Sequence, residues 1–185
     1  MTGFRDLLAR DRVLPVVTPA SVDNALAAVD RLGATGTGTL EVALRTGVAE
    51  AALARAAGGP VLVGAGTVLV PEQVDRVVDA GAAFVVTPGF SAPVVERCLA
   101  LGVPVLPGVA TPGEVMAALS LGLNLVKLFP ARELGGPAMV RALAGPFPGL
   151  RLVPSGGVTA ASAAEYLALD AVLAVSGSWL LADAS

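Results

Sequence analysis

Short apolar runs alternate with alanine-rich stretches of helical periodicity along the whole chain, and no other feature constrains the fold as strongly. The apolar runs are continuous rather than interleaved with polar residues, which is typical of parallel strands covered by helices. Eight strands are expected, at residues 13–17, 39–44, 61–65, 83–86, 103–106, 123–128, 150–153 and 171–175. A short leading helix is expected at 4–10, and helices follow the first seven strands at 21–32, 48–57, 71–80, 92–101, 112–121, 137–144 and 159–167.

Eight such units predict an α/β fold of the closed (β/α)8, or TIM-barrel, type rather than an open doubly wound sheet. A typical barrel has about 250 residues, so the 185 residues here form a minimal one, and we expect residues 1–185 to be a single domain. Only residues 178–182 remain for the eighth helix. This truncated final helix would leave one flank of the barrel exposed or covered by a neighbouring subunit.

Composition excludes several classes of function. A net charge of -3 and scattered arginines provide no basic face for nucleic acid. The lack of histidine excludes catalytic triads and histidine-ligated metals, and the single Cys98 excludes an internal disulfide or a cysteine metal cluster. Every apolar run is interrupted before the roughly 18 residues of a membrane-spanning helix, and residues 1–10 are too charged for a signal peptide. We therefore expect a cytoplasmic protein without nucleic-acid or membrane partners.

Lys127 is the only lysine among the 12 basic residues, and it lies within the run that predicts the sixth strand. A guanidinium can bind an anion but cannot act as a nucleophilic amine, whereas a buried lysine can. We interpret Lys127 as a catalytic amine. The alternative is an incidental lysine in an arginine-biased chain, with its amine reaching solvent.

The second strand carries two charged residues on one face. Because side chains alternate along a strand, Glu41 and Arg45 share a face, while Leu40, Val42 and Leu44 share the other. The apolar face belongs against the helices, so both charges point into the barrel, where an unpaired charge is costly. A structural ion pair is one interpretation. Residues four apart in an extended strand lie roughly 13 Å from each other, so a shared ligand or water fits at least as well.

Glycine and hydroxyl residues follow the third and fourth strands, at the end of a TIM barrel where active sites lie. The third strand ends in two glycines and Thr67, which supplies one hydroxyl at the rim. Pro88 and Gly89 follow the fourth strand and by themselves indicate a turn rather than a site.

The seventh and eighth strands end in glycine–serine segments, at 155–157 and 176–178. Glycines that allow close approach, serine hydroxyls and free N–H groups at a helix start are typical of an anion site. TIM barrels frequently bind phosphate after these two strands.

These residues together predict a cavity with an amine (Lys127), a carboxylate (Glu41), a fixed cation (Arg45) and a phosphate cradle. An amine that can condense with a ketone, a base and two anion sites indicate Schiff-base chemistry on a phosphorylated keto acid. This chemistry requires no metal and no cofactor.

In this order the motifs resemble those of the class I 2-keto-3-deoxy-6-phosphogluconate (KDPG) aldolases, which also act on 4-hydroxy-2-oxoglutarate (KHG). The resemblance extends from Val13 to Leu181 and rests on seven segments: LEVALRT at 40–46, GAGTV at 64–68, TPGF at 87–90, VKLFPA at 126–131, GPF at 145–147, SGGV at 155–158 and GSW at 177–179. It implies cleavage of KDPG to pyruvate and glyceraldehyde 3-phosphate in the Entner–Doudoroff pathway, cleavage of KHG to pyruvate and glyoxylate, and a homotrimer.

The resemblance also implies roles for individual residues. Lys127 would form the Schiff base with the C2 ketone, and Glu41 would accept the C4 hydroxyl proton through a water. Ser155 would lie beside the substrate hydroxyls. The pyruvate carboxylate would be held by Arg45, Thr67, Pro88 and Gly89. The phosphate would be held by Gly156, Gly157 and Ser178.

Four features depart from the family pattern. Glycines and threonines at 35–39 precede the second strand and should weaken its start. Arg132 stands where glutamate is frequent, Ser176 stands where glycine is usual, and family members continue by a further helix. The alternative functions are 6-phosphogalactonate aldolase activity on the C4 epimer, or a non-catalytic phosphate-binding barrel or assembly scaffold.

Overall fold

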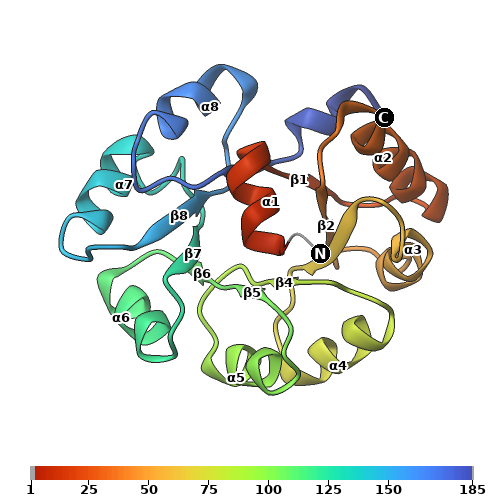
Figure 1. The fold of residues 1–185 in the computed structure, drawn as a ribbon, viewed down its shortest axis with the longest axis horizontal. Helices are drawn as coiled ribbons and strands as arrows, with labels where there is room; N and C mark the ends of the chain where they lie inside the picture. The colour runs from red at the N-terminus through yellow and green to blue at the C-terminus, as the bar shows by residue number, and fades with distance from the viewer. Residues whose placement is uncertain (1–2, 185) are drawn as a thin grey trace.

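The computed structural model describes residues 3–184, which form a ring of parallel strands surrounded by helices (Figure 1). The strands are β1 (Val13–Val17), β2 (Thr39–Ala43), β3 (Leu62–Gly66), β4 (Val85–Val86), β5 (Val105–Leu106), β6 (Gly108–Val109), β7 (Leu125–Leu128), β8 (Arg151–Pro154) and β9 (Val175–Gly177). The helices are α1 (Phe4–Asp11), α2 (Val22–Thr35), α3 (Ala49–Ala56), α4 (Pro71–Asp79), α5 (Ala92–Ala100), α6 (Pro112–Ser120), α7 (Pro137–Ala144) and α8 (Ala160–Leu167), and the 3-10 helix η1 covers Trp179–Ala184.

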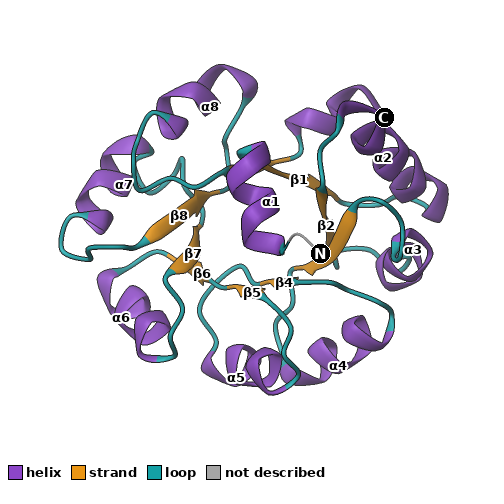
Figure 2. Cartoon of the chain, in the orientation of Figure 1, coloured by secondary structure: helices purple, strands orange, loops and turns teal. Residues whose placement is uncertain are grey.

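The strands close into the predicted (β/α)8 barrel. One sheet has the order β5-β4-β3-β2-β1-β9 and the other β6-β7-β8. The isolated bridges Leu152↔Val172 and Ser155↔Ser176 join β8 to β9. Segments β5 and β6 are two parts of one barrel strand that Pro107 interrupts, since proline has no N–H for the ladder. Figure 2 shows helices α2 to α8 lying outside the strands, with α1 over the centre of the ring.

Every predicted strand and helix has a counterpart in the structure, although the fourth strand is shorter than predicted and the fifth continues beyond its predicted end, at Gly108–Val109. At the eighth strand the predicted bounds were wrong. The apolar run at 171–175 predicts a strand there, yet the ladder to β1 begins only at Val175↔Val13. Val172 and Ala174 are buried, with no ladder of their own beyond the isolated bridge at Val172. A run of apolar residues indicates burial, and a buried loop can contain such a run as well as a strand. The eighth helix is a short 3-10 segment, in agreement with the expected stub.

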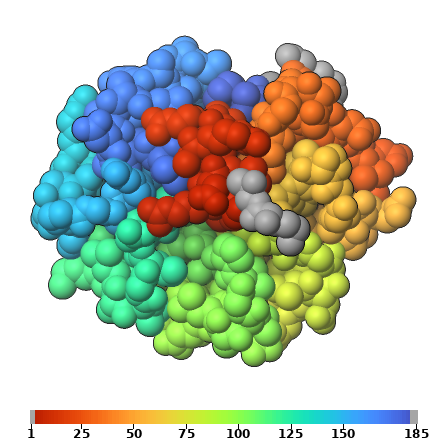
Figure 3. Space-filling model, in the orientation of Figure 1, coloured from red at the N-terminus to blue at the C-terminus, as the bar shows by residue number. Residues whose placement is uncertain are grey.

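Three apolar clusters hold the barrel together. Two lie between the strands and the surrounding helices. The third fills the barrel interior with Leu14, Phe84, Leu106 and Val153, and helix α1 adds Phe4 and Leu8 to it. The rings of Phe4 and Phe84 stack with centroids 4.0 Å apart. Helix α1 thus closes the amino ends of the strands, and Figure 3 shows it covering the centre of that face.

The start of β2 is held by the end of α1. The Gly38 N–H donates to Asp11 Oδ2 at 2.7 Å, and Arg10 Nη2 donates to the Gly36 carbonyl at 3.0 Å. A Cβ on Gly38 would lie 2.8 Å from Arg10 Nη2, so the glycine lets α1 approach closely. Burial raises the pKa of Asp11, but hydrogen bonds from Arg10 and Gly38 outweigh it and the net pKa lies below its ordinary value. The glycine-rich segment that was expected to weaken β2 is therefore a docking surface for α1.

No helix among the described residues is both long and apolar enough to cross a bilayer.

Replacing Phe4 with alanine should lower the free energy of unfolding by about 3–5 kcal/mol, because a buried aromatic side chain is lost from the barrel interior. Urea unfolding followed by circular dichroism measures the change. Met116→Ala on α6 is the matched control, since that side chain is 62% exposed and its loss should cost no more than about 0.5 kcal/mol. Equal unfolding midpoints for the two variants would contradict the role of α1 as part of the core.

Candidate active site

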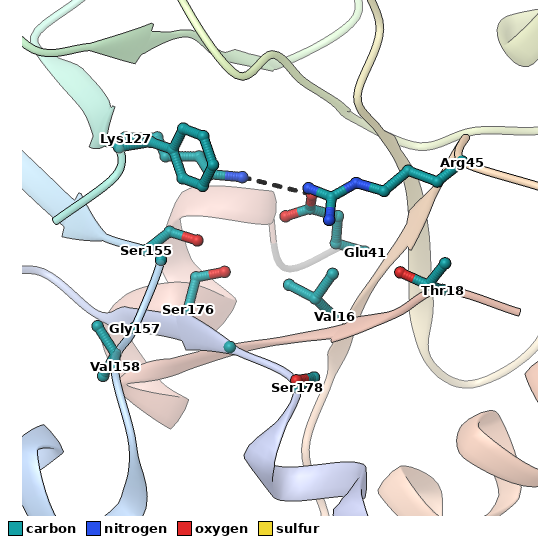
Figure 4. A pocket seen from close by; sticks show the side chains of 13 residues that line it. Val16, Thr18, Glu41, Arg45, Lys127, Ser155, Gly157, Val158, Ser176 and Ser178 are labelled. Atoms are coloured by element: carbon teal, nitrogen blue, oxygen red, sulfur yellow. Dashed lines mark hydrogen bonds and ion pairs between the residues drawn. The ribbon is translucent and has the colours of Figure 1, made fainter. Parts of the chain in front are cut away.

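A cavity of about 180 Å³ opens at the carboxyl ends of the strands (Figure 4). Seven of the predicted site residues line it, from four strands and the loops that follow them: Glu41, Arg45, Lys127, Ser155, Gly156, Gly157 and Ser178. Residues more than 130 positions apart in the sequence therefore meet at one place.

The Lys127 amine and the Glu41 carboxylate face each other across the barrel. Lys127 Nζ lies 3.4 Å from Glu41 Oε1, and the side chains are only 5% and 1% exposed. Lys127 Nζ also lies 5.4 Å from the centre of the Phe129 ring, which offers its negative face to the ammonium. Glu41 Oε2 is buried and makes no hydrogen bond among the described residues. The pair holds an amine away from bulk water and leaves one carboxylate oxygen free to accept a proton.

Glycine at position 66 makes room for the Glu41 side chain. Gly66 lies on β3 beside β2, and a Cβ there would overlap the Glu41 carboxylate. Gly66 thus allows the Glu41 carboxylate its position beside β3.

Arg45 and Thr67 interact at the rim of the cavity. Arg45 Nε donates to Thr67 Oγ1 at 3.2 Å, and Thr67 holds a left-handed backbone with φ of 62°, which is uncommon for a β-branched residue. Arg45 thus hydrogen-bonds to Thr67, and Glu41 pairs with Lys127. A ligand or water shared by Glu41 and Arg45 stays a prediction.

Pro88 and Gly89 lie outside the cavity. They line a neighbouring depression with Leu69 and Phe90. The turn is fixed by Thr87, whose hydroxyl donates to the Gly89 carbonyl at 2.6 Å and accepts the Gly108 N–H at 3.1 Å.

Two glycines with positive φ form the loop after β8. Gly156 and Gly157 have φ of 89° and 71°, a region that favours glycine, and α8 begins three residues later behind the Thr159 cap. A Cβ on Gly157 would lie 2.5 Å from Arg132 Cβ, so only glycine fits. Ser178 follows β9 and lines the same side of the cavity. The glycine loop and the Ser178 hydroxyl thus line the cavity together with the amine.

Several cavity residues were absent from the predicted set: Val16, Thr18, Phe129, Val158, Ser176 and Gly177. Thr18 follows β1 directly, so the rule that polar residues at strand ends face the site would have found it. Ser176 lies within the predicted glycine–serine segment and was passed over for Ser178. Val16 and Phe129 carry no polar signal and could be placed only by the barrel geometry.

No group of three or more Cys, Asp or Glu side chains gathers in metal-binding geometry within residues 3–184.

Comparison with known proteins places the chain in a family. The model of the family described as "Aldolase: KDPG and KHG aldolase" matches residues 5–185. The 2-dehydro-3-deoxy-phosphogluconate aldolase of Treponema pallidum is 47% identical over 183 residues, covering 98% of this chain and 87% of the relative. The KHG/KDPG aldolase of Escherichia coli K12 is 40% identical over 187 residues, covering 99% and 87%.

Solved structures agree with this relationship. The KDPG aldolase of Legionella pneumophila, with pyruvate captured as a covalent carbinolamine, superposes with a TM-score of 0.90 at 38% identity over 95% of this chain and 86% of that one. The KDPG aldolase of Zymomonas mobilis ZM4 with 3-phosphoglycerate gives 0.91 at 36% identity over 97% and 87%. A family model that spans nearly the whole chain, relatives at 40% and 47% identity and the shared barrel establish that this chain belongs to the KDPG and KHG aldolase family.

Proposed function

We propose that this chain is a class I aldolase that cleaves 2-dehydro-3-deoxy-6-phosphogluconate to pyruvate and glyceraldehyde 3-phosphate, with Lys127 as the Schiff-base amine. The observation that carries the proposal is the buried amine 3.4 Å from a buried carboxylate, in a cavity that the glycine loop after β8 also lines. The covalent carbinolamine with pyruvate in the Legionella aldolase supports amine chemistry at this site.

The reaction begins when the neutral Lys127 amine attacks the C2 ketone. Loss of water gives a protonated imine, which is an electron sink. Glu41, through a water, accepts the C4 hydroxyl proton, the C3–C4 bond breaks, and its electron pair moves into the imine to form an enamine. The aldehyde phosphate leaves, the enamine is protonated at C3, and hydrolysis returns the lysine and releases pyruvate.

The binding roles follow the two anionic ends of the substrate. The pyruvate carboxylate would lie against Arg45 and Thr67, which are already bonded to each other at the rim, with the turn at Pro88 and Gly89 nearby. The phosphate would lie against the glycine loop after β8 and Ser178. The Zymomonas aldolase with 3-phosphoglycerate supports a phosphate site in this fold. Ser155 lines the cavity beside Gly156 and would face the substrate hydroxyls.

The proposal extends to a shorter substrate and to the assembly of the protein. The Escherichia coli relative carries both activities in its name, which supports cleavage of KHG to pyruvate and glyoxylate. We propose one catalytic domain that acts in the cytoplasm in the Entner–Doudoroff pathway. Large apolar side chains exposed on α5, on α6 and before α4 support a homotrimer: Leu69, Val70, Leu99, Leu101, Met116 and Leu119.

Borohydride reduction in the presence of pyruvate tests the central step. The native chain should gain one reduced pyruvate adduct on Lys127, seen by mass spectrometry, and should release pyruvate from KDPG. Lys127→Arg keeps the charge beside Glu41 but removes the nucleophilic amine, so both the adduct and the cleavage should be lost. Because Lys127 is the sole lysine, an adduct on the arginine variant would contradict the assignment.

Faster cleavage of the C4 epimer than of KDPG would favour the 6-phosphogalactonate aldolase, and no adduct on the native chain would favour a binding barrel or scaffold.

Glu41→Gln should separate imine formation from bond cleavage. The amide keeps the shape of the side chain but accepts no proton, so kcat for KDPG should fall by about 10²- to 10⁴-fold. The pyruvate adduct should still form on Lys127, which borohydride trapping measures. Unchanged turnover would remove Glu41 as the base.

Ser178→Ala should weaken binding of the phosphate end alone. Loss of one hydrogen bond to a dianion should raise KM for KDPG by about tenfold, with little change for KHG, which lacks the phosphate. Steady-state kinetics on the two substrates measures the difference. A similar rise in KM for both substrates would argue against a phosphate role.

A further inference from the structure

Ser176 is a buried hydroxyl that the mechanism above leaves without a role. It lies on β9, is 0% exposed, and its Oγ makes no hydrogen bond among residues 3–184. Its side chain lines the active-site cavity, and Figure 4 shows the hydroxyl pointing into it. A buried hydroxyl without a partner is unfavourable, so this group is placed to bind something that enters the cavity.

The register of the barrel places Ser176 in the same layer as the catalytic pair. Side chains from alternate strands of a TIM barrel share a layer, and the register advances by about one residue per strand. Lys127 pairs with Val153. The bridge Ser155↔Ser176 extends that register to Ala174, just before β9, and the stagger of two strands then gives Ser176.

The same step leads from Ser176 to the carboxylate. Ser176 pairs with Leu14, and Val16 pairs with Glu41, so the residue of β2 at the level of Ser176 is Thr39. The stagger across two strands moves this position by two residues, to Glu41. The measured contact between Lys127 and Glu41 agrees with this layer. Ser176 therefore stands between the two catalytic side chains on the wall nearest the phosphate loops.

Ser155 is the nearest neighbour of Ser176 across the sheet. The two residues form a bridge between β8 and β9, and in Figure 4 both hydroxyls point the same way into the cavity. Ser178, on the phosphate side, lies two residues further along the chain, about 6.6 Å in an extended strand. A substrate that joins Lys127 to the phosphate loops must pass its middle carbons over these two hydroxyls.

The geometry points to Ser176 as a specificity-determining residue that, together with Ser155, binds the adjacent C4 and C5 hydroxyls of the substrate. This inference rests on the proposed aldolase function. Each serine hydroxyl can donate one hydrogen bond and accept others, which matches two neighbouring hydroxyls. KHG has a carboxylate at C5 in place of the second hydroxyl. The site thus selects phosphorylated sugar acids with a vicinal diol over shorter 4-hydroxy-2-oxo acids.

Ser176→Ala tests this through the ratio of two substrates. Loss of one hydrogen bond should lower kcat/KM for KDPG by about three- to tenfold, while kcat/KM for KHG should change by less than twofold. Ser176→Cys, which keeps nearly the same volume but bonds weakly, should give the same bias and serves if the alanine variant folds poorly. An equal fall for both substrates, or no change for either, would overturn the inference.

Thr39→Val is the matched control. Thr39 carries the other inward-facing hydroxyl that is buried without a partner in the described part of the chain, but it does not line the cavity. Its replacement should leave the substrate ratio unchanged, and a shifted ratio would show that any buried hydroxyl has this effect.

The pyruvate adduct distinguishes failure of the aldolase proposal from failure of the Ser176 inference. A native chain that forms no adduct fails as an aldolase, whereas an active native chain with an unshifted ratio in Ser176→Ala refutes only the role of Ser176.

Discussion

The buried pair of Lys127 and Glu41 is the interaction on which the rest of the site depends. Removing two charges from water costs several kcal/mol for each ion, and a direct contact repays this only when the geometry is good and the remaining polar atoms find partners. At 3.4 Å the contact is long, and Glu41 Oε2 has no partner among the described residues. Such a pair adds little to folding stability by itself. The apolar layers of the barrel interior supply the folding stability instead.

The barrel makes the pair possible through features that have no chemical role of their own. Gly66 leaves space for the carboxylate on the neighbouring strand. Pro107 interrupts the strand beside β7, yet its carbonyl still accepts the Lys127 N–H at 2.8 Å, so the lysine stays in the ladder where the adjoining strand breaks. Phe84, Val86 and Leu106 fill the interior beneath the pair. Packing and strand register therefore fix the position of the amine. A shift of β7 by one residue would turn the Lys127 side chain out of the barrel.

Much of this arrangement could be predicted from the sequence, because burial on both faces gives parallel strands an unambiguous apolar signature. Strand β1 and helix α7 begin and end at the predicted residues. Lys127 was singled out as the only lysine, and Glu41 by its place on the inward face of a strand. The errors have physical causes. Residues 171–174 are apolar because they are covered, although their ladder is absent. The carboxylate-binding role of Pro88 and Gly89 stays a prediction, since the two residues line a separate depression. Ser176 was overlooked because its importance comes from the stagger of the strands, which no local pattern encodes.

Closure of the amino end by helix α1 has a consequence for how substrate and products enter and leave the site. Phe4 and Leu8 pack into the interior with Leu14 and Phe84, so the cavity is a blind chamber with one mouth at the carboxyl ends of the strands. In the proposed reaction the pyruvate fragment would be bound to the buried Lys127, and the phosphate would lie against the exposed Gly157 and Ser178. The aldehyde phosphate would then leave first, and the same opening would admit the water that frees pyruvate. A chamber with one opening thereby fixes the sequence of departure without any moving part.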